Sequence, residues 1–350
     1  MMINGKLRTF NMNIINSVSS PMGKKISSLE SVLRWIGEDL EKVDQEFRKN
    51  LRNNVPIISA IGEHLLLSGG KRFRPILLLL AAKLCGYQGD DHISMASLIE
   101  FIHTATLLHD DVVDRAKLRR GIESANCRWG NEACILVGDF LFTKCFSLMV
   151  ENGNIKILRT IAKATRLMAE GELEELVNTN DLSLTEENYL SIITRKTAPL
   201  FSASTQIGAI LGNVSEEREG ALSDFGVDLG IAFQLIDDNL DYTSREEEFG
   251  KKIGIDLRNG KITLPLIFTL SHCNKEEETF IRETVELNPI TKKSFFQVVE
   301  IIERYHGLHY TWEKAKEYVE RAKRHLHLFP NLREKEALHI LANYVLERRL

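Results

Sequence analysis

Two aspartate clusters of the form Asp-Asp-x-x-Asp constrain this chain more than any other feature. The first consists of Asp110, Asp111 and Asp114, and the second of Asp237, Asp238 and Asp241. Each follows a long apolar segment with helical spacing, and residues three or four apart share one face of a helix. Carboxylates gathered in this way repel one another and raise one another's pKa unless a cation lies among them. Since Mg²⁺ suits sparse carboxylates that are completed by substrate phosphates, the pattern predicts metal ions that bridge the protein to a phosphorylated substrate.

Helical spacing continues through most of the chain. Ser27 and Glu30 have capping-box spacing ahead of the first helical segment. Further helices are expected over residues 94–114, 139–150, 155–177, 185–211 (kinked at Pro199) and 222–242, with a polar connection at 115–130. No alternating run with hairpin signals occurs, and no internal repeat or long linker divides the chain. We therefore expect an all-α fold, a large single-domain helical bundle over residues 27–350 with a central active-site cavity.

Composition excludes several classes of protein. The net charge of -4 gives no reason to expect nucleic acid as a partner. The five cysteines lack ligand spacing and indicate reduced thiols in a reducing compartment. No apolar run reaches the roughly 18 residues of a transmembrane helix, so no membrane span is expected.

The beginning of the chain differs from the rest. Residues 1–26 are basic and carry no acid, and they predict a disordered or over-extended tail. An organellar transit peptide is a weak alternative to the bacterial-like cytoplasmic location that we expect.

A polar stripe leads into each aspartate cluster at steps of three or four residues. The two stripes consist of His103, Thr106, Asp110 and Asp114, and of Gln234, Asp237, Asp238 and Asp241. A polar stripe on a buried helix is unfavourable unless it lines a site, which favours a functional role for both.

Cationic residues accompany the clusters. Arg119 and Arg120 follow the first, and the fork of an arginine matches phosphate oxygens. Segment 244–261 is charged and glycine-spaced, which is typical of a mobile lid. Lys251 and Lys261 lie in this segment and could close over phosphate.

Two further segments offer charge at a disturbed helix or a loop. Lys196 and Thr197 lie just before the expected kink, where they present a charge and a hydroxyl. The loop Gly69–Pro75 carries Lys71 and Arg74 at a loop-to-helix junction, which suits an anion, although it lacks the spacing of a P-loop.

Taken together, these motifs resemble the trans-type polyprenyl diphosphate synthases, most closely the bacterial octaprenyl diphosphate synthases and their long-chain relatives. The matching segments occur in family order from about residue 27 onward: Gly69–Pro75, Glu100–Asp114, Arg119–Gly121, Gly138–Leu141, Lys196–Ala198, Phe233–Asp241 and Gly260–Pro265. The chain's end, Arg348-Arg349-Leu350, only approximates the basic terminus of the family, and we assign it no role.

The resemblance implies a role for each candidate residue. Three Mg²⁺ would bind the allylic diphosphate, two held by Asp110 and Asp114 and the third by Asp237, with Asp111, Asp238 and Asp241 completing the clusters. Isopentenyl diphosphate would bind Lys71, Arg74, His103 and Arg120. The allylic side would be completed by Arg119, Lys251 and Lys261 and by the catalytic set Lys196, Thr197 and Gln234. The reaction would ionise the allylic C–O bond, after which the double bond of isopentenyl diphosphate attacks the cation.

The resemblance also implies a homodimer and a product tunnel. Growth would continue until a wall blocks it, because each added isoprenoid unit buries four or five carbons worth on the order of 0.8 kcal/mol each. Ala105 and Thr106 stand where short-chain relatives place aromatic residues, so the floor is expected deeper, at Phe146, Met149 or Ile161. We expect a product of about C40 made from farnesyl diphosphate for quinone side chains, with transient membrane contact at product release.

Other readings stay open. They are a short- or medium-chain synthase, a class I terpene cyclase, a non-catalytic partner subunit and a helical scaffold with solvated acidic patches. A cyclase normally lacks the second Asp-Asp-x-x-Asp, and a non-catalytic subunit should have lost aspartates.

Overall fold

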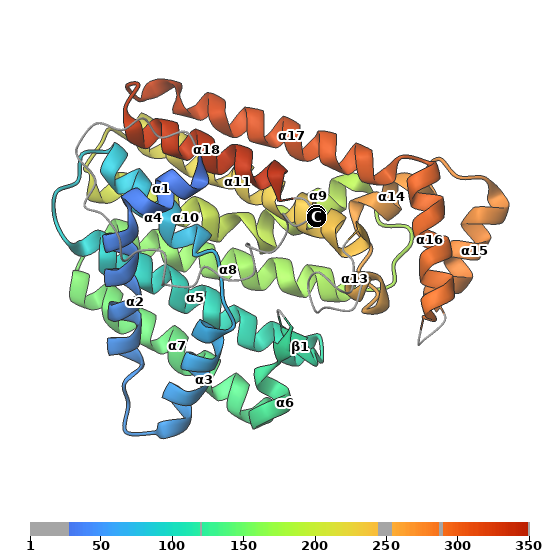
Figure 1. The fold of residues 1–350 in the computed structure, drawn as a ribbon, viewed down its shortest axis with the longest axis horizontal. Helices are drawn as coiled ribbons and strands as arrows, with labels where there is room; N and C mark the ends of the chain where they lie inside the picture. The colour runs from blue at the N-terminus through green and yellow to red at the C-terminus, as the bar shows by residue number, and fades with distance from the viewer. Residues whose placement is uncertain (1–27, 120, 244–253, 287–289, 349–350) are drawn as a thin grey trace, which may run out of the picture. The chain divides into compact units, whose positions relative to one another are not determined.

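The structure, a computed structural model, describes residues 28–119, 121–243, 254–286 and 290–348. The predicted tail at 1–26, Arg120 and Lys251 lie outside these residues. Within them the chain is almost entirely helical (Figure 1), so the all-α prediction is confirmed.

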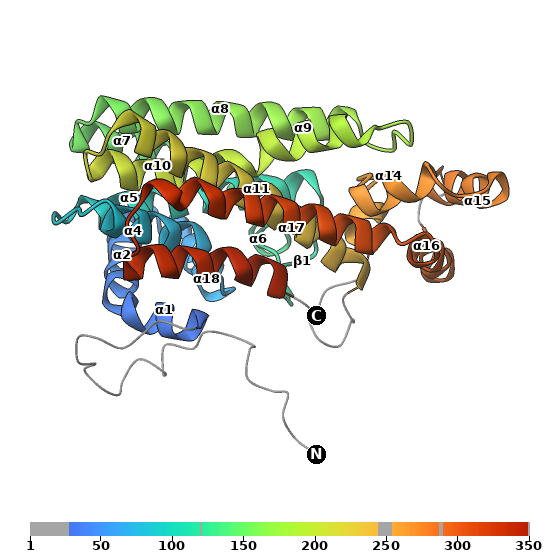
Figure 2. The same ribbon diagram turned by 90° about the horizontal axis from the view of Figure 1, so that it is seen from above.

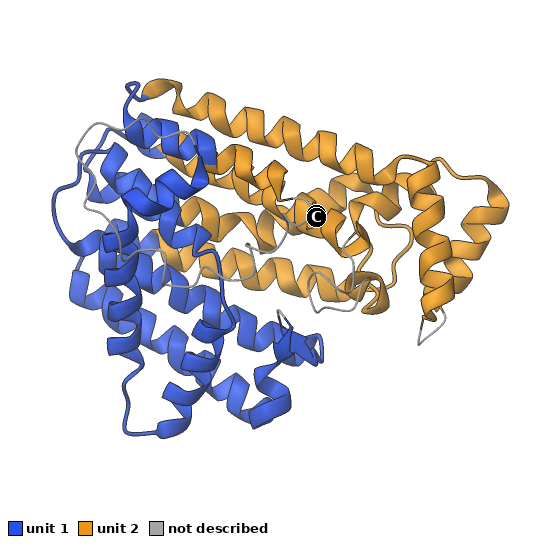
Figure 3. Ribbon diagram, in the orientation of Figure 1, with its two compact units in different colours: residues 1–159, 204–219, 329–340 blue, residues 160–203, 220–328, 341–350 orange. Residues whose placement is uncertain are grey.

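The chain divides into two compact units (Figure 3). Unit 1 comprises residues 1–159, 204–219 and 329–340, and unit 2 comprises residues 160–203, 220–328 and 341–350. That residues 27–350 form one domain stays a prediction. The helices α8, α10, α11 and α18 each contain residues of both units.

Unit 1 is built around α5, whose faces are nearly all buried. Its elements are α1 (Leu29–Trp35), α2 (Gly37–Leu51), α3 (Pro56–Leu67), α4 (Phe73–Leu84), α5 (Asp91–Val113), β1 (Leu118–Arg119), β2 (Ile122–Glu123), α6 (Ala125–Trp129) and α7 (Asn131–Asn152). On α2, the apolar residues Val43, Phe47 and Leu51 recur every fourth residue and are all buried, and the rings of Phe47 and Phe101 of α5 stack at 4.2 Å. This packing fixes the helix that carries the first aspartate cluster.

Several local predictions for unit 1 need correction. The first described capping box is formed by Ser28 and Ser31, whose side chains each accept from the other's backbone N–H; Ser27, of the predicted box, lies outside the described residues. The polar connection at 115–130 contains the antiparallel pair β1–β2 and the short α6. The helix expected at 139–150 begins earlier, at Asn131.

One described helix, α7, is long and apolar enough to cross a membrane, although 39% of its most apolar window is buried in the structure. Asp139 and Lys144 interrupt this helix, so it is not the unbroken apolar run that the sequence analysis considered. Its buried face includes Cys145, whose Sγ lies 3.8 Å from the carbonyl oxygen of Leu98 in α5. That contact is typical of a core helix rather than a lipid-facing one.

The remaining helices lie wholly or partly in unit 2. They are α8 (Ile155–Val177), α9 (Glu186–Lys196), α10 (Ala198–Leu211), α11 (Glu216–Thr243), α13 (Ile255–Arg258), α14 (Leu264–Leu270), α15 (Lys275–Glu286), α16 (Lys292–Arg304), α17 (Gly307–His325), the 3-10 turn η2 (Leu326–Leu328) and α18 (Arg333–Glu347). In Figure 2, α14, α16 and α17 pack together at one end of this unit. The predicted helix 155–177 has the bounds of α8.

The expected kink at Pro199 is a complete break. Helix α9 ends at Lys196 and α10 begins at Ala198. Pro199 therefore lies in the first turn of α10, where its missing N–H removes no hydrogen bond of the helix. Thr197 stands between the helices, and its N–H still donates to Ile193. The break places Lys196 and Thr197 at a helix end rather than mid-helix.

Close approach of α9 to α8 depends on Gly171. A Cβ at this position would lie 2.4 Å from the backbone nitrogen of Lys196 and 2.7 Å from the carbonyl carbon of Arg195. Since these are backbone atoms, they cannot move aside as a side-chain end would. Gly171 thus lets the end of α9 rest directly on α8.

We expect Gly171→Ala to lower the free energy of unfolding by about 1–3 kcal/mol through overpacking. The matched control is Gly220→Ala, an exposed position in α11 where an added Cβ meets no atom within 4 Å. There, higher helix propensity should stabilise the protein by about 1 kcal/mol. Urea unfolding of both variants measures this, and equal effects would contradict the close packing.

Candidate active site

The first aspartate cluster ends helix α5. Asp110 and Asp111 lie in its last turn and Asp114 is its C-cap, with no basic residue in that turn. The C-terminus of a helix carries partial negative charge and favours cations, so three carboxylates there are unfavourable by themselves. The carboxylates at the end of α5 therefore need stabilisation by positive charge from outside this helical turn.

The predicted stripe follows one half-exposed face of α5. His103, Thr106, Asp110 and Asp114 all have intermediate exposure, whereas Ala105, Leu108 and Asp111 are buried. Asp110 and Asp114, four residues apart, share this face. Both carboxylates are thus in a position to meet a ligand from outside the helix.

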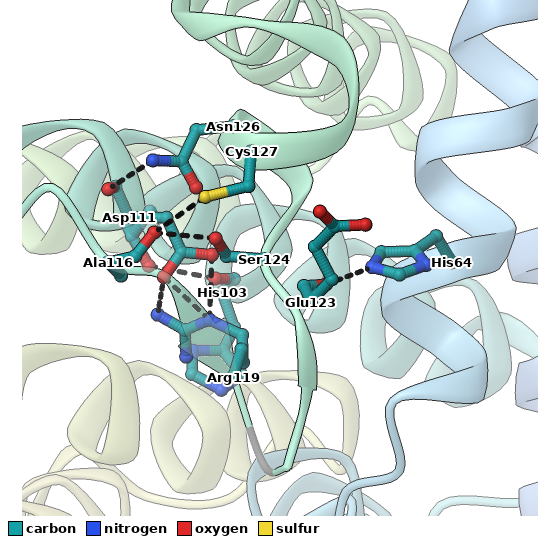
Figure 4. A network of polar contacts seen from close by, with 10 residues as sticks. His64, His103, Asp111, Ala116, Arg119, Glu123, Ser124, Asn126 and Cys127 are labelled. Carbon is teal, nitrogen blue, oxygen red and sulfur yellow. Dashed lines mark hydrogen bonds and ion pairs between the residues drawn. The ribbon is translucent and has the colours of Figure 1, made fainter. Parts of the chain in front are cut away.

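Asp111 has a different environment. Its side chain is 1% exposed, and both of its oxygens accept hydrogen bonds from Arg119, at 2.9 Å from Nε and 2.7 Å from Nη2. Asn126 donates to its carbonyl oxygen at 3.1 Å. Figure 4 shows this network with the β1–β2 hairpin. Asp111 therefore anchors the hairpin to α5, and its place among the metal ligands stays a prediction.

The glycine-rich loop contacts α5 about two turns before the cluster. Nη1 of Arg74 lies 3.3 Å from Nε2 of His103, and Lys71 of the same loop is exposed. The structure therefore brings together, in unit 1, Arg74 and His103, two of the residues predicted to bind the second diphosphate.

The second cluster lies in the last two turns of α11, again with no basic residue in the last turn. Asp237 and Asp241 are half-buried, and Asp238 is 3% exposed. The same conflict with the helix dipole arises here. Each cluster, in its own unit, thus places three carboxylates at the C-terminal end of a helix.

Asp237 is paired within the protein. Nη2 of Arg348, next to the C-terminal end of α18, donates to its Oδ1, and the guanidinium stacks over the ring of Phe233 at 3.9 Å. The side chain of Arg348 is mostly buried, so the ion pair is shielded from solvent. A protein cation thus occupies one oxygen of the carboxylate that is predicted to hold a metal ion.

Asp238 is enclosed by hydrogen bonds. The hydroxyl of Tyr189 donates to its Oδ2, and Nε2 of Gln234 donates to Oδ1 at 2.8 Å. Oε1 of Gln234 accepts from the hydroxyl of Thr197 at 2.7 Å. Burial, with the charge of Asp256, holds the pKa of Asp238 well above its usual range. As with Asp111, these bonds fix the position of the Asp238 side chain, and its predicted metal contact stays a prediction.

Asp241 accepts hydrogen bonds from two backbone N–H groups. Its Oδ1 accepts from the N–H of Ile255 at 3.2 Å, and its Oδ2 accepts from the N–H of Asp256 at 3.0 Å. These are the first amides of α13, which a carboxylate stabilises. The third aspartate thus holds the short helix that leads to Lys261.

Lys196 and Lys261 converge on one carboxylate. Glu175 of α8 lies 2.6 Å from Nζ of Lys196 and 3.3 Å from Nζ of Lys261. Burial by itself raises the pKa of Glu175, but the two ammonium groups outweigh it and lower the pKa. A pocket of unit 2 is lined by Lys196, Lys261, Gln234 and Asp238, among others. Glu175, Asp238 and Asp256 also line this pocket, so its two lysine ammonium groups lie among three carboxyl groups.

Among the described residues, no three His, Cys, Asp or Glu side chains form a closed metal cage. The donors nevertheless fit Mg²⁺, which takes one or two carboxylates and completes its shell with water and substrate phosphates. Two half-exposed carboxylates on the end of α5, and one on α11, match that requirement.

The chain-length candidates differ in burial. Ala105, Met149 and Ile161 are buried, and Thr106 is half-buried. Phe146 is 52% exposed, because it lies on the outer face of α7 while Met149 lies on the inner one. Phe146 is thus not part of the core of this chain, and its role in limiting chain length stays a prediction.

Spacing along the sequence did not predict several residues of the site. Tyr189, Glu175 and Arg348 act on positions that lie 49, 21 and 111 residues away in the chain. No local spacing indicates such pairs. The basic end of the chain was a signal for Arg348, but not for its partner.

The chain resembles known proteins over most of its length. The sequence profile of the family "Polyprenyl synthetase" matches residues 55–302. The octaprenyl diphosphate synthase of Escherichia coli is 41% identical over 321 residues, 92% of this chain and 99% of that protein. The octaprenyl diphosphate synthase of Haemophilus influenzae is 40% identical over 323 residues, 92% of this chain and 98% of that protein.

A solved structure matches as well. A polyprenyl synthase from Caulobacter crescentus, complexed with calcium and isoprenyl diphosphate, has a TM-score of 0.89 and 40% identity, covering 94% of this chain and 100% of that one. Family members use divalent metal ions. The aspartate clusters, the all-α fold and these matches lead to one assignment: the chain belongs to the polyprenyl synthetase family of prenyltransferases.

Proposed function

We propose that this enzyme joins isopentenyl diphosphate to an allylic diphosphate, farnesyl diphosphate by preference, and makes an all-trans product for quinone side chains. The proposed product has about eight isoprene units, the length in the names of its octaprenyl relatives. The observation that carries the proposal is the pair of carboxylate clusters on helix C-termini, each without a basic residue in the last turn. Such ends need cations, and a metal–diphosphate complex supplies them.

Asp110, Asp114 and Asp237 are the proposed Mg²⁺ ligands. They are the half-buried first and third aspartates of the first cluster and the first of the second. When bound, Mg²⁺ neutralises negative charge on the leaving diphosphate. Three ions per site, as the resemblance implies, is part of this proposal.

The chain's own cations serve the two diphosphates. We assign Lys71, Arg74 and His103 to isopentenyl diphosphate, and Lys196 and Lys261 to the allylic diphosphate. Charge-assisted hydrogen bonds from such groups are short and strong. Arg120 and Lys251 keep the proposed diphosphate roles, although they lie outside the described residues.

The reaction breaks the bond between the allylic carbon and its diphosphate oxygen, and it forms a carbon–carbon bond to isopentenyl diphosphate. One proton then passes from the new chain to the departed diphosphate, and a double bond is restored. Lys196 and Lys261 stabilise the departing negative charge, while Gln234 and Thr197 fix the neighbouring polar surface. No side-chain nucleophile is required, so the protein contributes position and electrostatics.

Asp110→Ala should remove most activity without unfolding the protein. A metal ligand contributes several kcal/mol to the transition state, which corresponds to a loss of roughly a hundredfold or more in kcat. Incorporation of labelled isopentenyl diphosphate at increasing Mg²⁺ measures it. Asp224→Ala, at an exposed position of α11, is the control and should keep full activity. Near-normal turnover in a folded Asp110→Ala protein would refute the metal assignment.

We further propose a homodimer. The outer face of α7 exposes Leu136, Phe146 and Val150 at helical spacing, and such apolar patches mark interaction sites. A second copy of the chain would bury them.

Light scattering should give twice the 39.9 kDa of one chain at micromolar concentration. Phe146→Glu should shift the mass toward the monomer, because a buried charge without a partner opposes association. Phe296→Glu, at another exposed phenylalanine, is the matched control and should stay dimeric. A wild-type monomer with full activity would contradict the proposal.

Product length should respond to Ala105, which is buried in α5 five residues before Asp110. Ala105→Tyr should shorten the product by filling the space below the site, and Met149→Ala should lengthen it by removing a wall. Thin-layer chromatography of the dephosphorylated products measures both. Ala162→Tyr, at an exposed alanine of α8, is the control. An unchanged product from a folded Ala105→Tyr enzyme would exclude a tunnel past this helix.

A further inference from the structure

Arg72 has an unusual backbone conformation at the start of α4. It is the N-cap residue, with φ 47° and ψ 35° in the left-handed region. Side chains with a Cβ rarely adopt this region, because the Cβ approaches the following carbonyl oxygen. Some interaction of this arginine must therefore compensate for the strain.

The side chain of Arg72 supplies that interaction through two ion pairs. Its Nε lies 3.2 Å from Oδ1 of Asp44 in α2, and its Nη1 binds Oε1 of Glu100 in α5. The exposed fractions of the Arg72 and Glu100 side chains are only 18% and 9%. A buried charge is strongly unfavourable without its partner, so the three groups hold one another in place.

The next charged residue of the loop is held on the same helix. Nη1 of Arg74 lies 3.3 Å from Nε2 of His103, which follows Glu100 by one helical turn. Between the two arginines, Phe73 is buried in the core. The loop is thus fixed to adjacent turns of α5 on both sides of an apolar anchor.

We propose that Arg72 is a positioning residue for the isopentenyl diphosphate site. By holding the backbone left-handed, its ion pairs keep Lys71 and Arg74 on either side directed toward the diphosphate. A glycine would permit the same backbone but would leave the loop free to move. This inference rests on the proposed function, since it assumes that Lys71 and Arg74 bind that substrate.

The test compares Arg72→Ala, Arg72→Gly and Arg72→Lys in steady-state kinetics with both substrates. For Arg72→Ala we expect the KM for isopentenyl diphosphate to rise on the order of tenfold, with kcat and the allylic KM changed less than about threefold. Arg72→Gly should show the same defect, because it relieves the strain but lacks the anchor. Arg72→Lys keeps the charge and should recover part of the affinity.

The control is Arg34→Ala, which removes an exposed arginine paired with Glu30 in the same unit and should change neither KM. Normal kinetics in folded Arg72→Ala, full recovery in Arg72→Gly, or equal loss for both substrates would each overturn the proposal. If Arg72→Ala does not fold, Glu100→Gln and Asp44→Asn remove one partner each and should give smaller rises in the same KM; unchanged values in both would also overturn it.

Amide hydrogen exchange separates this inference from the proposed function. Loss of the anchor should speed exchange of residues 69–76 in the variants without any substrate present, and unchanged exchange would refute the anchor. If the wild type consumed no isopentenyl diphosphate, the proposed function would fail, and the role assigned to Arg72 would fail with it. Faster exchange alone would then show a structural anchor only.

Discussion

The repulsion among carboxylates at the C-terminal ends of α5 and α11 is the constraint on which the rest of the site depends. Each end adds three aspartates to a partial negative charge of the helix itself. Packing can hold such helices in place, but it cannot remove the electrostatic conflict. The surrounding cations and hydrogen-bond donors reduce the repulsion among these carboxylates.

The repulsion is reduced in the same way in both clusters. The second aspartate of each motif is buried and bound by protein donors: Asp111 by Arg119, and Asp238 by Tyr189 and Gln234. The first aspartate of each keeps intermediate exposure. The two adjacent motif positions therefore differ in burial, although both have the same side chain.

The sequence was sufficient for the fold class and for α8, because helical spacing and end signals are local. It also indicated which segments carry charge. It did not separate the roles of Asp110 and Asp111, since burial depends on the hairpin that supplies Arg119. Glu175 and Arg72 were missed for a similar reason: their partners come from other helices, and no spacing along the chain records those contacts.

The cations of the site are held by acids before any substrate arrives. Glu175 binds Lys196 and Lys261, and Asp44 and Glu100 bind the arginine beside Lys71. Fixing a long cationic side chain opposes binding by up to about 2 kcal/mol of lost rotamer entropy. Where a carboxylate has already fixed the cationic side chain during folding, substrate binding causes no further loss of its rotamer entropy. The same acids keep several like charges close together, which a diphosphate requires and which the lysines and arginines could not maintain alone.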